Sequence, residues 1–496
     1  MAVGQGIAIV PALGGPVRIL VPEERDRPVQ SPAWSPDGKR LAYAAGSKIR
    51  VRDLDSGKDT VIAETGEASG PGGARFGMAF QLAWSPDGKW IAAVIGNFRF
   101  AFGGSDLGSI APASIMIVSA TTGRVVHLTD NRVEDIMEVS PVWTSDSRHL
   151  LFVSTRDGGR DVYEMALSSS MAPTGPVSRL TTGLSAHSIS LSTDDRTLTY
   201  STYQPMSNIW SVPIPPGEET MVGTGREITH STALIEEVSV SADGSSLVYN
   251  SNRSGSSDLY RMPTRGGAEI QLTSDSTYEF GPSWSPDGRE ILFNAIREGQ
   301  FQIMVVPSDG GTAQLVTSTR PRGSDWSADG TKILFGGDPG RKEGIQMTSR
   351  TGSAWSAATT LDGTTGGWLP RASPDGKWVA FLTSPNPSAL AVVPATGGTP
   401  RVLVRAGDPA GTPAPQQPMW SRDSRSIFFT AMDANGTGAI WSVPAEGGTP
   451  RPRLRFTDPD LQMGSGNGRF GVDARNFYVR LSRHAGSIGT ADLQRR

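Results

Sequence analysis

Few side chains in this sequence could do metal or covalent chemistry. The 496 residues include five histidines and no cysteine, which excludes thiolate zinc sites, disulfides and a thiol nucleophile. Any metal ligand or nucleophile must therefore come from His, carboxylates, Ser or Thr. The patterns G-x-S-x-G, H-E-x-x-H and G-x-x-x-x-G-K-[ST] do not occur. We therefore predict no catalytic residue, no metal ligand set and no cofactor.

One group of residues could instead form a binding site, because its members stand about seven positions before the Asp of a recurring turn. They are Glu138, His187, Glu236, Glu237, Glu279, Arg322, Trp368 and Gln416. The carboxylates could bind a divalent cation or a basic peptide segment, and Trp368 could stack on a ring. The alternative is a hydrated polar funnel without a specific ligand. Of the five histidines, only His187 falls at this position; His127, His149, His230 and His484 do not.

The elements that must position these residues are repeats. A W-S-P-D-G-K-type turn occurs ten times, 42 to 59 residues apart, with its aspartate at Asp37, Asp87, Asp146, Asp194, Asp243, Asp287, Asp329, Asp375, Asp423 and Asp473. Pro presets φ for a tight turn, Asp bonds backbone amides beyond it, and Gly supplies a positive φ. We predict that these aspartates are structural, since a residue repeated in nearly every unit does not mark a single active site.

Each repeat has the pattern of four short strands. An alternating segment such as Glu290-Ile291-Leu292-Phe293 follows the turn, and a third segment ends in a pair such as Leu259-Tyr260. A Gly-Gly turn then leads to a fourth segment, as at Gly266-Gly267. Period-two alternation dominates and no long helical pattern is present. The sequence therefore predicts an all-β fold.

A four-stranded sheet of this size cannot bury both of its faces alone, so we expect the sheets to stack, with the motif Trp filling the gaps between them. Radial stacking of this kind gives a β-propeller. The W-S-P-D-G-[KR] turn, the D-[IL]-[YW] strand and the G-G turn resemble the WD40-like (PD40) propeller repeats of the TolB family. In such a fold, the loop that enters each first strand reaches the channel mouth, which is where the eight candidate residues would lie.

The resemblance to TolB implies a non-catalytic binding or scaffold protein that recognises a protein or peptide partner at the channel mouth. It also implies a location outside the cytoplasm, as in the periplasm. The first residues lack the basic and unbroken apolar stretches of a secretory signal, and no segment has the length and apolarity of a spanning helix. The alternative function is a propeller hydrolase or lyase that acts on peptides or sugars at the same mouth.

The repeats extend over residues 1–496, with blades expected to start near 31, 81, 138, 187, 236, 280, 322, 368 and 416. A closing blade shared by 1–30 and 465–496 would make about ten four-stranded blades. Because propellers usually have four to eight blades, two packed rings are favoured over one large ring. The boundary between the rings is left open by the sequence.

Two stretches depart from the repeat. Gly96 to Gly104 contains three Phe between glycines, which favours an apolar loop packed on its own blade over a loop that contacts a partner. Gly407 to Pro418 is rich in Pro and is expected to be a linker or long surface loop.

The charge of the chain argues against nucleic-acid and lipid partners. The sequence holds 46 Lys and Arg against 49 Asp and Glu, a formal net charge of -3. A chain with this balance has no strong positive potential to attract nucleic acid or anionic lipid. We therefore expect neither nucleic-acid binding nor membrane insertion.

Overall fold

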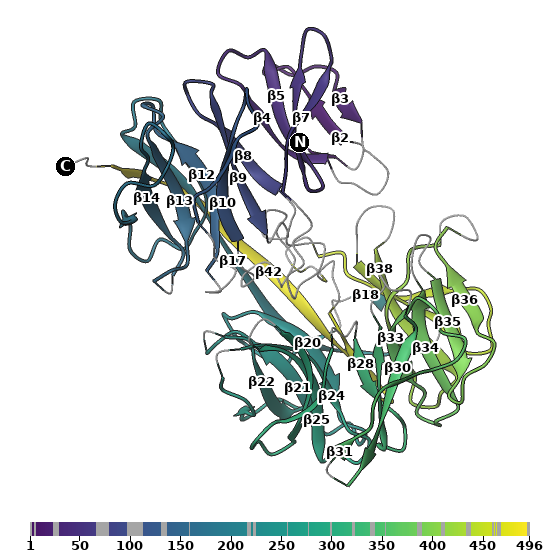
Figure 1. Ribbon diagram of the computed structural model, residues 1–496. Helices are drawn as coiled ribbons and strands as arrows, with labels where there is room; N and C mark the ends of the chain where they lie inside the picture. Colours follow the sequence, from purple (N-terminus) through teal and green to yellow (C-terminus); the bar gives the residue numbers. More distant parts are fainter. Residues whose placement is uncertain are drawn as a thin grey trace. The chain divides into compact units, whose positions relative to one another are not determined.

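A computed structural model describes residues 2–493 except 4–5, 23–28, 66–78, 97–112, 130–135, 158, 216–219, 222–224, 255, 276, 298–299, 320–322, 338–342, 353, 384–388, 408–411, 433–437, 459–460, 462 and 464–467. The described residues form 42 β-strands and no helix, which confirms the all-β prediction (Figure 1). Accordingly, this part of the chain contains no helix with the length and apolarity needed to cross a bilayer. Most of the loop from Gly96 to Gly104, and residues 408–411 of the Pro-rich stretch, lie outside the described residues.

The recurring turn is held by its Ser and Asp side chains. In the first copy, Ser35 Oγ donates to Asp37 Oδ1 at 2.5 Å, and the same oxygen accepts from the backbone N of Lys39 at 3.0 Å. The backbone N of Arg40 donates to Ser35 Oγ at 2.9 Å, and Gly38 has a φ of 69°. The Ser/Thr–Asp bond recurs at Asp87, Asp146, Asp194, Asp243, Asp287, Asp329, Asp375 and Asp423. These carboxylates close turns, as the sequence indicated.

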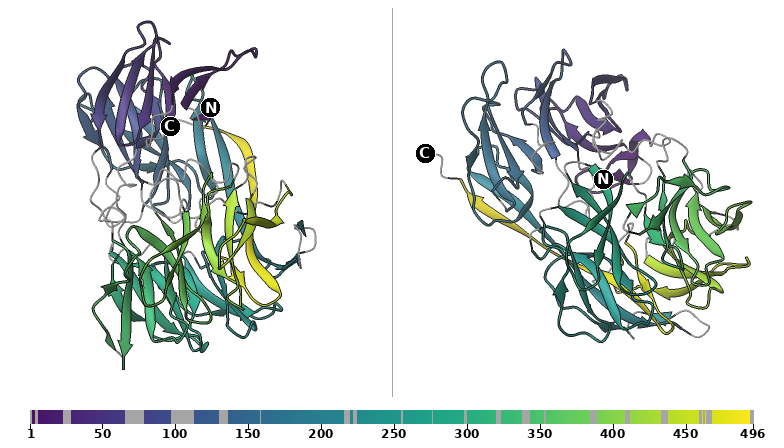
Figure 2. Two further views of the ribbon diagram at one scale, coloured as in Figure 1. Left: turned by 90° about the vertical axis from the view of Figure 1, so that its right-hand side faces the viewer. Right: turned by 60° about the horizontal axis from the view of Figure 1, so that its bottom comes forward.

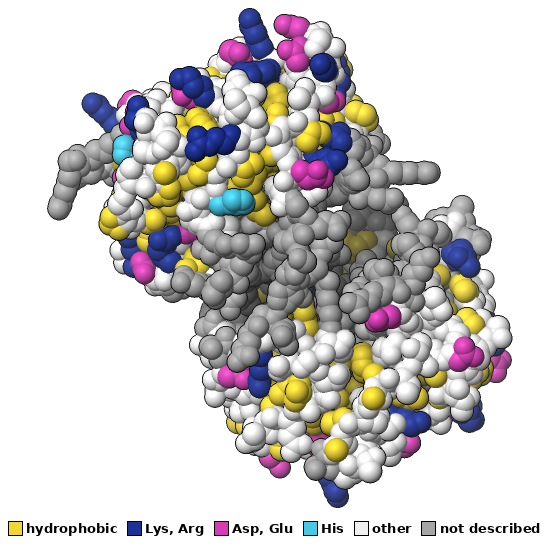
Figure 3. Space-filling model, viewed as in Figure 1, with side chains coloured by type: hydrophobic (Ala, Val, Ile, Leu, Met, Phe, Trp, Pro, Cys, Tyr) yellow, Lys and Arg dark blue, Asp and Glu magenta, His cyan; other side chains and the backbone are white. Residues whose placement is uncertain are grey.

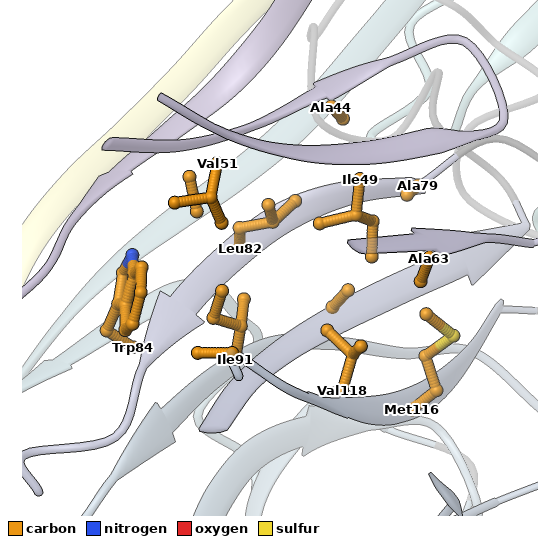
Figure 4. Close-up of a cluster of buried hydrophobic side chains, with 13 residues drawn as sticks. Ala44, Ile49, Val51, Ala63, Ala79, Leu82, Trp84, Ile91, Met116 and Val118 are labelled. Atoms are coloured by element: carbon orange, nitrogen blue, oxygen red, sulfur yellow. The ribbon is translucent and has the colours of Figure 1, made fainter. Parts of the chain in front are cut away.

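The motif tryptophans join neighbouring sheets. Trp84 Nε1 donates to the carbonyl of Ala33 at 3.0 Å, and Trp143 Nε1 donates to that of Ala83 at 3.1 Å. Figure 4 shows the Trp84 ring within a cluster of buried side chains from two successive sheets, close to Ile91. Trp326 and Trp420 make the same kind of bond, so these four Trp combine apolar burial with a hydrogen bond across the gap between sheets. Trp34 is 51% exposed, and Trp284 Nε1 has no partner among the described residues.

The chain divides into two compact units, Met1–Gln204 with Ala485–Arg496, and Pro205–His484. Figures 1 and 2 show that each unit is built of small twisted sheets. The unit boundaries fall inside two long strands, β17 (Thr197–Pro213) and β42 (Asn476–Asp492).

The first unit contains a three-stranded N-terminal sheet, three four-stranded sheets, and β16 with the parts of β17 and β42 that belong to it. Its first strands contact one another in chain order, β4 with β8, β8 with β12 and β12 with β16. Its strands are β1 (Ala2–Val3), β2 (Gly6–Ile9), β3 (Arg18–Pro22), β4 (Val29–Trp34), β5 (Arg40–Ala45), β6 (Lys48–Asp53), β7 (Asp59–Glu64), β8 (Ala79–Trp84), β9 (Trp90–Gly96), β10 (Ala113–Ser119), β11 (Val125–His127), β12 (Glu138–Trp143), β13 (His149–Ser154), β14 (Asp161–Ala166), β15 (Ser178–Arg179) and β16 (Ala186–Leu191).

In the second unit, the first strands of six sheets contact one another in a closed cycle, in the order β20, β24, β28, β33, β37, β41 and back to β20. Closure of this kind is that of a β-propeller. Its strands are β18 (Thr220–Met221), β19 (Arg226–Glu227), β20 (Ile235–Val240), β21 (Ser246–Ser251), β22 (Asp258–Pro263), β23 (Ile270–Gln271), β24 (Tyr278–Trp284), β25 (Glu290–Arg297), β26 (Gln300–Pro307), β27 (Gln314–Ser318), β28 (Ser324–Trp326), β29 (Lys332–Gly336), β30 (Ile345–Thr351), β31 (Ala354–Trp355), β32 (Thr359–Thr360), β33 (Gly367–Ala372), β34 (Trp378–Thr383), β35 (Ala389–Pro394), β36 (Arg401–Arg405), β37 (Gln416–Trp420), β38 (Ser426–Met432), β39 (Gly438–Pro444), β40 (Arg451–Arg455) and β41 (Gly471–Val472).

The expected closing blade shared by 1–30 and 465–496 is wrong. The described N-terminal strands pair only with one another, in the order β1-β2-β3, whereas β41 and β42 lie in the sheet ordered β16-β17-β42-β41. The repeat that starts near 187 is also not a self-contained blade, because its second and third segments are one continuous strand, β17. The residues between them, Ser201 to Ser207, include no Gly, and β17 pairs with β42 in one sheet instead of folding back into a hairpin.

Charged side chains of both signs lie on the described part of the face shown in Figure 3. Figure 3 shows Lys and Arg side chains interspersed with Asp and Glu over the face in view. This agrees with the near-balanced composition of the chain.

Candidate functional site

The first strand of most sheets contains a β-bulge, and the side chain at the bulge reaches the next sheet. The backbone N of Gln81 donates to Ser31 Oγ at 2.9 Å, and that of Ser140 donates to Gln81 Oε1 at 2.7 Å. Ser140 Oγ in turn accepts from the backbone N of Ile189 at 2.9 Å. These bulge residues have φ values between 47° and 54°. In the first unit, the bulges therefore form a neutral hydrogen-bonded relay from sheet to sheet.

In the second unit, charged groups join the first strands. Glu237 stands at the bulge position, and Asp325, Arg371 and Arg469 stand two positions further along the repeat. Arg469, just before β41, donates through Nη2 to Asp325 Oδ1 at 2.8 Å, and through Nη1 to the carbonyl of Ser324 at 3.4 Å. Its backbone N donates to Glu237 Oε1 on β20 at 3.4 Å. Arg371 on β33 donates to the same Ser324 carbonyl at 3.3 Å and to Gln417 Oε1 on β37 at 3.4 Å. Each of these two arginines thus links three sheets.

The sixth sheet joins through Ser283 on β24, whose Oγ donates to Asp325 Oδ1 at 2.9 Å. We call this set the axial network, and it consists of Glu237, Ser283, Ser324, Asp325, Arg371, Gln417 and Arg469. It connects all six sheets of the second unit along their first strands.

The axial network balances its own charge. Arg371 and Arg469 are 3% and 5% exposed, and the two carboxylates that face them belong to Asp325 and Glu237. Burial raises the pKa of Glu237, and the nearby Arg469 and Arg371 counteract that rise. Burial and the neighbouring Arg469 lower the pKa of Arg371 to about 9. Buried charges are tolerated only when paired in this way, because an unpaired one costs several kcal/mol.

Glu236, adjacent to Glu237, belongs to a second polar group. Its Oε2 accepts from Asn250 Nδ2 at 2.7 Å and from Tyr278 Oη at 2.5 Å. Burial raises the pKa of Glu236 to about 7, although the Tyr278 hydrogen bond opposes the rise. Asn250 also fixes the backbone of β20, because its Oδ1 accepts a hydrogen bond from the backbone N of Glu237 at 3.0 Å. Both glutamates that the sequence singled out therefore lie on the inner strand β20, in separate polar groups.

Three other candidates of the second unit lie on first strands outside the axial network. Glu279 is fully buried and faces Thr273 and Arg297, with Oε1 3.5 Å from Arg297 Nη2. Burial raises the pKa of Glu279 to about 8. Trp368 packs beside the apolar cluster around Leu382, and Gln416 is half-buried at the start of β37.

The three remaining candidates are not part of the described second unit. Glu138 is fully buried on β12 of the first unit, where it pairs with Arg156. His187 is half-buried on β16 of the first unit, and burial with the nearby Arg160 lowers its pKa to about 4. Arg322 lies outside the described residues.

The sequence reasoning missed Asp325, Arg371 and Arg469, although the repeat contains a pattern that distinguishes them. All three stand four residues before the Asp of the recurring turn. The other seven repeats have Ala33, Ala83, Val142, Ser190, Ser239, Ser283 and Met419 at that position. A charge at a position that is otherwise small or apolar indicates a special role for the side chain.

The arrangement can offer a partner hydrogen bonds and paired charges. Among the described side chains, no three His, Asp or Glu are grouped so that they could hold a metal ion. Glu237, Tyr278, Trp368 and Gln416 are each half-buried and lie on β20, β24, β33 and β37. We call these four residues the mouth residues, because each retains some exposed surface on a first strand.

Comparison with protein families gives a match over most of the chain. Residues 14–214 and 219–368 match the TolB beta propeller domain, PD40, which is well over half of the sequence. A stretch of 41 residues is 54% identical to the Tol-Pal system protein TolB of Mannheimia succiniciproducens. That stretch is 8% of this chain and spans only 10% of the relative.

Solved structures with similar architecture include a candidate TolB from Agrobacterium tumefaciens, at 21% identity and a TM-score of 0.46, over 57% of this chain and 99% of the other. They also include oligogalacturonate lyase from Vibrio parahaemolyticus, at 16% identity and a TM-score of 0.34, over 66% and 95%. Neither likeness bears on function. The family match, the repeated turns and the closed cycle of sheets agree, and the chain belongs to the TolB β-propeller domain family.

Proposed function

We propose that this protein is a non-catalytic binding or scaffold propeller that recognises a protein or peptide partner at the mouth residues of the second unit. The observation that carries the proposal is the combination of half-buried aromatic and amide side chains with a charge network on the same set of first strands that is already compensated. Tyr278 and Trp368 are of the types that dominate protein recognition sites. The paired charges of the axial network link the first strands to one another and leave little for a reaction to use.

The chemistry of the mouth residues favours a polypeptide over a small ion. Trp368 and Tyr278 provide flat apolar surface, and Gln416 provides an amide that can both donate and accept. The charge of Glu237 is already balanced by Arg469 and Arg371, so the aromatic and amide groups decide the partner and favour a segment with an exposed apolar residue. By family resemblance, we also propose that the protein works outside the cytoplasm.

The test is site-specific crosslinking. A photoreactive phenylalanine analogue at position 416 of the full chain, used in extracts of the source cells, should give a discrete protein adduct. The same analogue at position 446, an exposed turn residue of the outer strands, serves as the control and should not give that adduct. Adding Trp368→Ala to the 416 variant should remove most of it.

Two results would contradict the proposal. An adduct of equal yield at 416 and 446 would mean that the mouth residues confer no specificity. Turnover of oligosaccharides or peptides by the purified chain, abolished by Glu237→Gln, would favour the alternative of a hydrolase or lyase.

A further inference from the structure

The second unit contains a cavity of about 240 Å³ away from the first strands that carry the axial network. Its walls come from β17, from the segment that follows β19, from the residue Leu461 after β40, and from the end of the unit's part of β42. The cavity is smaller than the ~300–1,000 Å³ of pockets for drug-sized ligands. Its occupant must therefore be small.

Hydrogen-bond donors predominate in the cavity wall. Asn208 Oδ1 is already saturated, since it accepts from Thr229 Oγ1 at 2.9 Å and from the backbone N of Ser231 at 2.8 Å. Its Nδ2 makes one bond, to the carbonyl of Ser231 at 3.3 Å. Ser231 Oγ accepts from the backbone N of Ala233 at 2.9 Å, which leaves its hydroxyl proton able to donate.

Trp210 adds a donor that the fold does not use. Its indole Nε1 is buried and has no hydrogen-bond partner among the described residues. A buried donor without a partner costs about 1–3 kcal/mol, so a ligand that accepts a hydrogen bond from it would relieve that cost. In the same wall, the Trp210 side chain lies against the apolar cluster that contains Leu481 and Leu461.

The wall also carries one charge of each sign. Arg483 on β42 is exposed and provides a guanidinium, which pairs best with a carboxylate. Glu227 on β19 provides a carboxylate, 3.9 Å from Nδ1 of His230. Trp210 and Glu227 are direct partners in the β17–β19 pairing, so their side chains lie on the same face of the sheet.

We propose that this cavity binds a free α-amino acid with an apolar side chain. The ligand carboxylate would meet Arg483 and the donors of Asn208, Trp210 and Ser231, its ammonium group would meet Glu227, and its side chain would pack against Leu481. A zwitterion matches the two charges of the wall, whereas a simple carboxylate or a simple amine matches only one. This site is separate from the mouth residues and does not depend on the function proposed for them.

Isothermal titration of the full-length chain tests the proposal with three probes. L-Leucine carries both charged groups, 4-methylpentanoate lacks only the ammonium group, and isopentylamine lacks only the carboxylate. We expect saturable one-to-one binding of L-leucine, and binding of each analogue weaker by about tenfold or more, because each loses one charge-assisted hydrogen bond.

Matched variants assign the binding to the cavity. Arg483→Met and Glu227→Gln should each weaken L-leucine binding by about tenfold or more, and Trp210→Phe, which retains the ring but removes the N–H, should weaken it several-fold. Arg475→Met and Glu446→Gln change exposed residues of the same unit and should bind as the parent does. Thermal melts establish that each variant is folded.

The proposal fails if L-leucine gives no saturable heat up to about 10 mM. It also fails if folded Arg483→Met and Glu227→Gln both bind L-leucine as tightly as the parent, since the ligand would then lie elsewhere. Equal binding of 4-methylpentanoate and L-leucine would exclude a zwitterion site.

Discussion

At the scale of single residues, Glu236 and Glu237 are sequence neighbours in different electrostatic environments. Glu237 faces two guanidiniums, whereas Glu236 is held by the neutral donors Asn250 and Tyr278. Burial without a cation disfavours the ionised form, which is why the pKa of Glu236 rises to about 7. The folded state therefore binds this proton more tightly than the unfolded chain does. The stability that this group contributes is full below the ordinary glutamate pKa of 4.5 and is lost as the pH rises towards 7.

Glu236→Gln should accordingly leave stability unchanged near pH 4 and increase it at pH 8, by up to about 3 kcal/mol for a shift of this size. Gln retains an oxygen that can accept from Tyr278 and Asn250. Denaturant unfolding of parent and variant at both pH values measures the difference. Glu446→Gln, on an exposed turn, is the control and should show no such dependence. If Glu236→Gln changed the free energy of unfolding equally at pH 4 and pH 8, the pKa of Glu236 would not be raised in the folded protein.

At the scale of elements, the repeated turn is the structural unit that fixes each pair of strands. Hydrogen bonds from Ser241 Oγ and from the backbone N and Oγ of Ser245 lower the pKa of Asp243 to about 2. For a carboxylate with a lowered pKa, the stabilisation is present above the ordinary pKa and is lost as the pH falls through the folded value. Repetition of this turn predicts that the fold weakens progressively in acid.

Asp243→Ala should cost about 1 kcal/mol at pH 7, the usual value of a lost turn hydrogen bond on an exposed surface. The cost should shrink as the pH falls from about 4 towards 2, because the parent carboxylate then takes up its proton as well. Urea unfolding at several pH values checks this, with Asp55→Ala at another exposed turn as the comparison. A cost that is the same at pH 7 and pH 3 would show that the charge of Asp243 is not what stabilises the turn.

At the scale of the whole molecule, the second unit contains every strand of its own cycle. The strand pair β41–β42 completes the sheet that residues of β17 and β19 begin, and Arg469 fastens that pair to Asp325 and Glu237. Chain ends that meet in one sheet close a ring with hydrogen bonds along the strands, which is more stable than side-chain contact alone. The expectation of two rings, and of about ten blades, stays a prediction.

A fragment of residues 205–484 should therefore fold alone, with a β-type circular dichroism spectrum and a cooperative thermal melt. A fragment of residues 205–468 lacks Arg469, β41 and its part of β42, and should be unfolded or aggregate. If the shorter fragment melts as cooperatively as the longer one, closure by the C-terminal strands does not stabilise the unit.

The repeat determined much of this protein by itself. A turn of fixed chemistry recurring at blade-sized intervals permits few folds, so the all-β propeller class followed from residues such as Ser35 and Asp37 and from the motif Trp. These are local patterns, because the residues that make each turn are adjacent in sequence. Glu236 and Glu237 were singled out for the same reason, since their position relative to Asp243 is local.

Only the tertiary structure decided which strands close which sheet and which charges meet. Whether β17 continues or turns depends on a competing sheet edge, and β42, more than 200 residues later, provides that edge. The bond between Arg469 and Asp325 joins residues 144 positions apart, and no local pattern encodes that distance. Long-range pairing is set by the packing of whole sheets, so the sequence determined the blades, and the fold decided how they are joined.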